Sequence, residues 1–149
     1  MSLEKWVEYG WLKSEPSSSE EIVGLFGIVT RALKDANVQA ISDDLRFQAA
    51  FSAALTAANI ALRASGYRTR VQAGHHQKIV ESLEFTLKAD PRLIQKLKVL
   101  SKKRNATSYD SAGNVSDQEL EQAIKVAGEL QRSLTNWLNE NHPELMRNS

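Results

Sequence analysis

Residues 102–110, with the sequence Lys-Lys-Arg-Asn-Ala-Thr-Ser-Tyr-Asp, gather side chains that can bind a phosphate group. The guanidinium of Arg104 could make a forked contact with a phosphate or a carboxylate. Asn105 could fix that fork or reach a backbone group, and Tyr109 could hydrogen-bond either partner. Positions 105 and 109 share one face of a helix, and position 104 lies on the adjacent one. Four residues of this segment are candidates for ligand binding: Arg104, Asn105, Lys103 and Asp110.

Arg104 also continues an apolar stripe. Leu93, Leu97 and Leu100 recur at helical spacing, and Arg104 stands where the next leucine would come. Such a guanidinium either enters a buried ion pair with an acidic residue of the turn or of the last helix, or projects into a cleft that a ligand can reach. The residues alone leave both alternatives open.

A run of basic residues leads up to Arg104 with no acidic residue inside it. Its members are Arg92, Lys96, Lys98, Lys102, Lys103 and Arg104. Glutamates at 119, 121 and 129 could neutralise this run, which would then be an ordinary solvated face. Alternatively, the run extends the 102–110 segment into a phosphate-binding surface.

His75 and His76 are candidate catalytic residues, together with Arg104 and Tyr109. Two adjacent residues cannot both face one ion from a helix, and no carboxylate cluster accompanies them, so we expect no metal site. Either the two histidines are a solvated loop residue and a helix N-terminal residue, or one of them serves as an acid/base or phosphate-contacting group. His142 lies in the tail, and we expect it to be inert.

Composition excludes several classes of function. The chain has 149 residues, a net charge of +1 and no cysteine, which rules out disulfides, thiolate metal sites and cysteine nucleophiles. The low net charge favours a local polyanion contact over a general nucleic-acid coat. The acidic residues near the N-terminus argue against a signal peptide, and the most apolar run, residues 49–62, is too short to cross a bilayer. We therefore expect a cytoplasmic protein without cofactor or membrane association.

Apolar periodicity and capping signals predict helices and no sheet. The expected helices cover residues 19–36, 43–65, 76–89, 91–109 and 116–139, and the alanine-rich second one is expected at the centre. The fold class is all-α, an antiparallel bundle of about five helices in one domain, 1–149, with an N-terminal arm (1–16) and a C-terminal tail (140–149). The two tryptophans of the arm lie either on this chain's own bundle or on a second copy.

This ordered set of features resembles the HEPN superfamily of small helical domains, in particular one group of uncharacterised bacterial members. The resemblance is carried by Arg104-Asn105-x-x-x-Tyr109-Asp110 at a helix end, followed by a short turn and a capped last helix. A tryptophan-containing arm, a Ser-Glu-Glu helix start, Ala-Ser-Gly-Tyr-Arg at 64–68 and Gly-His-His at 74–76 extend the resemblance over nearly the whole chain.

The resemblance implies a HEPN-like homodimer in which two copies of the Arg motif face one cleft. Active members of the superfamily are metal-independent endoribonucleases, often the toxin of a toxin–antitoxin pair with a nucleotidyltransferase-like antitoxin. By position, Arg104 would hold the scissile phosphate, Asn105 would orient it, and Tyr109 stands where the family motif has histidine. Because an ordinary tyrosine has a pKa of about 10, it is a poor base at pH 7.

We therefore expect a domain that binds RNA or another phosphate-bearing ligand through Arg104, Asn105 and Tyr109 without efficient catalysis. One alternative is an endoribonuclease that uses a loop histidine as acid/base. The other is a non-catalytic structural or partner-binding module, in which the motif only supports the turn before the last helix.

Overall fold

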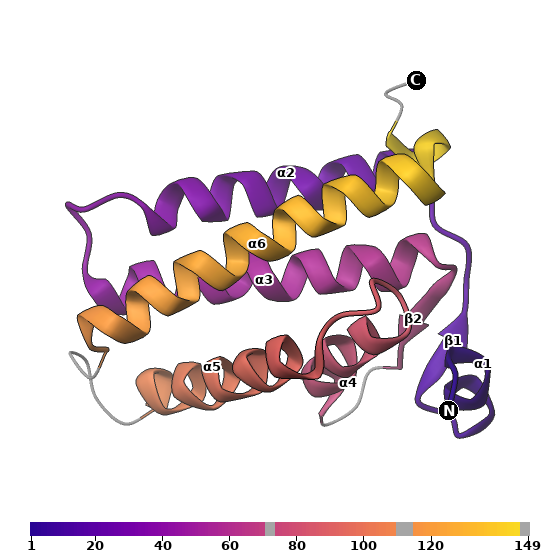
Figure 1. Ribbon diagram of the computed structural model, residues 1–149, viewed down its shortest axis with the longest axis horizontal. Helices are drawn as coiled ribbons and strands as arrows, with labels where there is room; N and C mark the ends of the chain where they lie inside the picture. Colours follow the sequence, from indigo (N-terminus) through magenta and orange to yellow (C-terminus); the bar gives the residue numbers. More distant parts are fainter. Residues whose placement is uncertain (71–73, 110–114, 147–149) are drawn as a thin grey trace.

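The computed structural model describes residues 1–70, 74–109 and 115–146, with the backbone alone for 106–109. In this part the chain forms an all-α helical bundle, as the sequence predicts (Figure 1). Its long helices are α2 (Ser19–Ala36), α3 (Asp43–Ala64), α5 (Pro91–Tyr109) and α6 (Asp117–Asn141). The shorter elements are α1 (Leu3–Glu8), α4 (His75–Glu81) and the 3-10 turns η1 (Ser82–Glu84) and η2 (Pro143–Met146).

Serine caps fix where three of the long helices begin. The hydroxyl of Ser18 accepts a hydrogen bond from the Glu21 amide at 3.1 Å, and Ser42 caps α3 in the same way. At α6 the capping box is complete, because Ser116 and Glu119 each accept a hydrogen bond from the other's backbone amide. These side chains satisfy amides that have no partner inside the helix, so the predicted helix starts are confirmed.

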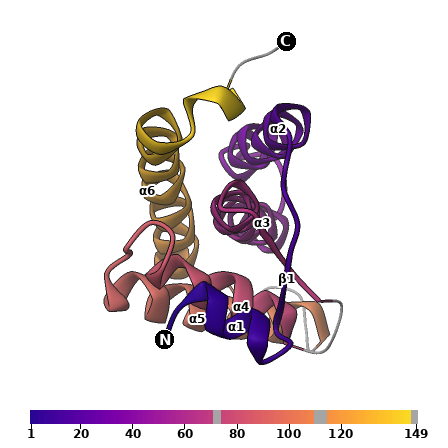
Figure 2. The same cartoon turned by 90° about the vertical axis from the view of Figure 1, so that its right-hand side faces the viewer.

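α3 is the central helix, as its alanine content predicts. It packs against α2, α4, α5 and α6, and the end-on view in Figure 2 shows it between α2, α6 and the layer that contains α4 and α5. Its small side chains allow neighbours to approach from several sides. The buried residues of α3 include Phe47, Phe51, Ile60 and Leu62 together with most of its alanines.

The prediction that the chain has no strand is wrong. β1 (Leu12–Ser14) pairs antiparallel with β2 (Tyr67–Thr69), with Leu12 opposite Thr69 and Ser14 opposite Tyr67. The ladder is extended by a 2.9 Å hydrogen bond from the Glu15 amide to the Gly66 carbonyl. Strands of three residues are too short to show an alternating pattern, and their pairing joins distant segments.

The N-terminal arm lies on the bundle of its own chain. Trp6 is buried, and its ring makes edge contacts with Phe85 at 5.3 Å and with Trp11 at 5.7 Å between centroids. The ammonium group of Lys78, on α4, lies 3.7 Å from the centroid of the Trp11 ring. Of the two interpretations of the tryptophan arm, the structure therefore supports packing on its own bundle.

The helix expected over 76–89 is shorter than predicted. α4 ends at Glu81 and passes into η1, where the buried Ser82 hydroxyl donates to the Ile79 carbonyl at 2.6 Å. Lys88 adopts a positive φ of 55°, and the Ala89 amide bonds back to the Leu83 carbonyl. This is the helix-terminating geometry that glycine usually provides.

The expected tail is also partly structured. α6 continues to Asn141, and η2 then places Leu145 and Met146 against the core. No helix in the described residues combines the length and the apolar character needed to cross a bilayer.

Candidate phosphate-binding site

Arg104 lies on the core-facing side of α5, as its place in the leucine stripe predicts. Leu97 and Leu100 are buried, and Arg104, one turn further along, is half-buried. Its guanidinium carbon lies 5.9 Å from the centroid of the Phe51 ring of α3. The aromatic ring thus supports the cation from one side.

No carboxylate in the described part of the chain forms an ion pair with Arg104. The last-helix glutamate that could have neutralised it, Glu119, is paired with Lys103 instead, at 3.4 Å. Lys103 therefore faces α6 and not the same surface as Arg104. Asp110 and the side chain of Tyr109 lie outside what the structure describes, so their predicted roles stay predictions.

The two candidate histidines open α4 and lie close to Arg104. Gly74, with φ of 84°, precedes the helix, and the rings of His75 and His76 are 4.2 Å apart between centroids. Both side chains are half-buried, so neither is a freely solvated loop residue. Burial lowers the pKa of His76 below 6.5, and the charges of His75 and Arg104 lower it further. His76 is therefore held as a neutral imidazole beside the guanidinium at pH 7.

The basic run divides into paired and unpaired members. Ion pairs join Arg92 to Asp90 at 3.0 Å, Lys98 to Glu81 at 3.5 Å and Lys103 to Glu119. Three of the six basic residues are thus neutralised by acidic partners on the surface. Within the described residues, no acidic group lies within 4 Å of the remaining three, Lys96, Lys102 and Arg104.

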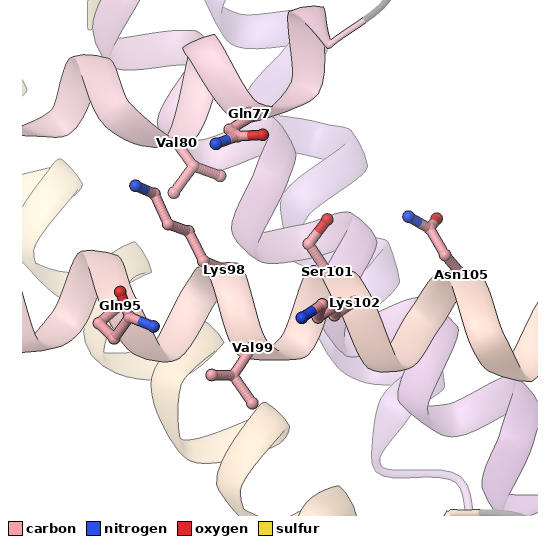
Figure 3. A pocket seen from close by; sticks show the side chains of 8 residues that line it. All are labelled: Gln77, Val80, Gln95, Lys98, Val99, Ser101, Lys102 and Asn105. Carbon is pink, nitrogen blue, oxygen red and sulfur yellow. The ribbon is translucent and has the colours of Figure 1, made fainter.

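Asn105 and Lys102 line a hollow between α4 and α5, and Arg104 itself is not part of the lining. The hollow has a volume of ≈ 380 Å³. Figure 3 shows Lys98 and Ser101 of α5 directed toward Gln77 and Val80 of α4, with Asn105 further along the same side of α5. The full lining is Gln77, Val80, Gln95, Lys98, Val99, Ser101, Lys102 and Asn105. Amide, hydroxyl and ammonium groups make this surface suited to phosphate oxygens.

Sequence reasoning missed Gln77 and Ser101 as members of this surface. A signal for the α5 side was present, because positions 95, 98, 102 and 105 repeat at steps of three and four and form a polar stripe. Nothing in the sequence showed that α4 would lie beside that stripe. The described residues contain no group of three or more potential metal ligands.

No protein-family model, curated protein or solved structure matches the chain.

Proposed function

We propose that the protein binds RNA, or another phosphate-bearing ligand, through Arg104 beside the start of α4, and through Asn105 and Lys102, which line the hollow between α4 and α5. The observation that carries the proposal is the position of Arg104. It is half-buried on Phe51, lies close to His76, and has no carboxylate partner among the described residues. A positive charge held in this way is available to a phosphate group.

The resemblance to the HEPN superfamily supports the same residues from the sequence side. It adds an expected homodimer and a nucleotidyltransferase-like antitoxin to the proposal. Light scattering on the purified protein tests the dimer: a mass of twice 16.6 kDa supports it, and the mass of one chain contradicts it.

Binding is tested by fluorescence anisotropy with a labelled single-stranded RNA of about 12 nucleotides. This length is within the usual site sizes of proteins that bind single-stranded nucleic acid. Arg104→Ala should weaken binding about tenfold, the loss expected for one charge-assisted hydrogen bond. Arg132→Ala removes an exposed arginine from α6 and serves as the matched control. Equal affinities of wild type and Arg104→Ala, with both proteins folded, would remove Arg104 from the site.

A second candidate function, a metal-independent endoribonuclease, is favoured by the lowered pKa of His76. A neutral imidazole can accept the proton of a ribose 2′-hydroxyl. The 2′ oxygen would then attack the adjacent phosphorus, the bond from phosphorus to the 5′ oxygen would break, and that oxygen would take up a proton from water, leaving a 2′,3′-cyclic phosphate. Arg104 would hold the charge on the phosphate oxygens.

Cleavage is tested by incubating the labelled RNA with the protein in EDTA. The nuclease predicts a cyclic-phosphate product that disappears in both His76→Ala and Arg104→Ala, and no cut at a position where the RNA carries a 2′-deoxyribose. Intact RNA with the wild type would reject the nuclease and leave the binding proposal in place.

A further inference from the structure

A larger groove lies on the other side of the two histidines, between α2, α3, β2 and α4. Its volume is ≈ 600 Å³, and both His75 and His76 contribute to its wall. His76 thus belongs to the wall of the groove and is also close enough to Arg104 to feel its charge. Because the groove forms between elements that are distant in sequence, no local motif predicts it.

The groove combines apolar side chains with polar and charged ones, among them the ion pairs of Arg63 with Glu21 and of Arg68 with Glu15. Leu25 and Ile28 come from α2, Leu55 from α3 and Ile79 from α4. Thr56 and Asn59 of α3 add a hydroxyl and an amide to the same lining. Ligand sites characteristically pair apolar surface with a few fixed polar groups.

Asn59 is the feature that folding alone does not explain. It stands in the middle of a helix whose neighbouring residues, Ala57, Ala58, Ile60 and Ala61, are all buried. Its half-buried amide makes no hydrogen bond to any described residue. Asparagine is a poor residue for a helix interior, and the amide of Asn59 is open to the groove and to solvent. A ligand in the groove would supply a hydrogen-bond partner.

The groove and Arg104 are linked along one side of α3. Phe51, Leu55 and Asn59 follow one another at intervals of four residues, so they lie on successive turns of the same side of the helix. Arg104 lies over Phe51, and the groove covers Leu55 and Asn59. The rise of 1.5 Å per residue separates the Phe51 and Asn59 positions by about 12 Å along the axis. The site thus has Arg104 at one end and, at the other, a groove that holds Leu55, the Asn59 amide and two arginine–glutamate ion pairs.

We propose that this groove holds the base of a nucleotide whose phosphate is bound at Arg104, an inference that rests on the proposed function. Leu55, Ile28 and Ile79 would cover the ring, and the Asn59 amide, which both donates and accepts, would pair with a base edge. Adenine offers the matching adjacent donor and acceptor to an asparagine amide.

The test compares the affinities of AMP and ribose 5-phosphate by isothermal titration calorimetry. The two ligands share a phosphate and a sugar and differ in the base. AMP should bind at least about fivefold more tightly to the wild type, a difference typical of one enclosed base. Asn59→Leu should lower the affinity for AMP to that for ribose 5-phosphate and leave the latter unchanged.

Two further variants keep the test decisive. Ile28→Trp fills the groove from a position that is already exposed, so it should weaken AMP binding without unfolding the protein. Asn136→Leu, on the exposed surface of α6, is the matched control and should change neither affinity.

The outcomes separate the two proposals. Equal affinities for AMP and ribose 5-phosphate in the wild type, or unchanged AMP binding in both Asn59→Leu and Ile28→Trp, would overturn the base site. If Arg104→Ala bound neither AMP nor ribose 5-phosphate, the phosphate site would still be supported. If Arg104→Ala changed neither affinity, the phosphate site would be wrong, and the joint placement of base and phosphate would fall with it.

Discussion

The guanidinium of Arg63 and the carboxylate of Glu21 meet in a forked contact that joins α3 to α2. Nε of Arg63 lies 2.6 Å from Oε2 of Glu21, and Nη2 lies 2.8 Å from Oε1. Nη1 also donates to the carbonyls of Glu15 and Tyr67, at 3.0 and 3.2 Å. One buried arginine therefore holds the end of the arm, the start of β2 and the first turn of α2 together. The fork lowers the pKa of Glu21 and keeps its carboxylate charged.

Arg63→Met should destabilise the fold by about 3 kcal/mol, because it leaves a carboxylate and three carbonyls without their donor. Arg63 is only 6% exposed, so water cannot replace it fully. Urea denaturation followed by circular dichroism gives the free energy of unfolding. Arg92→Met is the matched control, since Arg92 pairs with Asp90 on the surface, and its loss should change stability by less than about 1 kcal/mol. Similar values for the two variants would contradict the role given to Arg63.

The pH dependence of the free energy of unfolding should reflect the titration of the His76 imidazole. Its pKa is lowered in the folded protein, so between that value and 6.5 the unfolded chain binds more protons. Stability should therefore fall as the pH drops below about 6.5, and His76→Gln should flatten this part of the profile. His75 and Arg104 are the charged groups that act on His76. A histidine resonance that titrates at or above 6.5 in an NMR experiment, assigned with the variant, would refute the expectation.

Lys102 and Lys96 offer a matched pair for the RNA-binding surface. Both are exposed lysines of α5, but only Lys102 lines the hollow between α4 and α5. Lys102→Ala should weaken RNA binding and reduce the slope of log affinity against log salt by about 0.7, the value for one phosphate contact on a single strand. Lys96→Ala should leave the slope close to that of the wild type. If both variants lowered the slope equally, the binding surface would not be the hollow.

Ser116→Ala should lower the free energy of unfolding by about 1 kcal/mol, because it removes the hydroxyl that accepts the hydrogen bond from the Glu119 amide at the start of α6. Thermal unfolding of the variant measures this loss. Ser133→Ala, an exposed serine within the same helix, should be neutral or slightly stabilising since alanine is the better helix former. A Ser116→Ala protein as stable as the wild type would show that α6 does not depend on its cap.

Helix bounds were predictable wherever a local chemical signal marks them. The serines before α2 and α6, and the proline that begins α5, are read directly from the sequence because a cap or a proline acts within one turn. The end of α4 was not predictable in this way. There the chain leaves the helix through Ser82 and a positive-φ lysine, Lys88, a residue type that gives no stop signal.

The candidate site was predictable only in its parts. Arg104 was identified because it interrupts a leucine stripe within a single helix. Its closeness to His76 and its contact with Phe51 depend on how α3, α4 and α5 pack, which no local spacing encodes. Asn59 was visible only as a polar interruption of an apolar run, and its position in a groove follows from the packing of α2 and α4.

The short ladder between β1 and β2 has a practical consequence for handling the protein. β2 leads toward α4, so whatever pulls the first residues away from the bundle also pulls on the segment that carries His75 and His76. We therefore expect a purification tag after α6 to disturb the histidine segment less than a tag ahead of Met1. Measurements of binding should use a C-terminal tag or none.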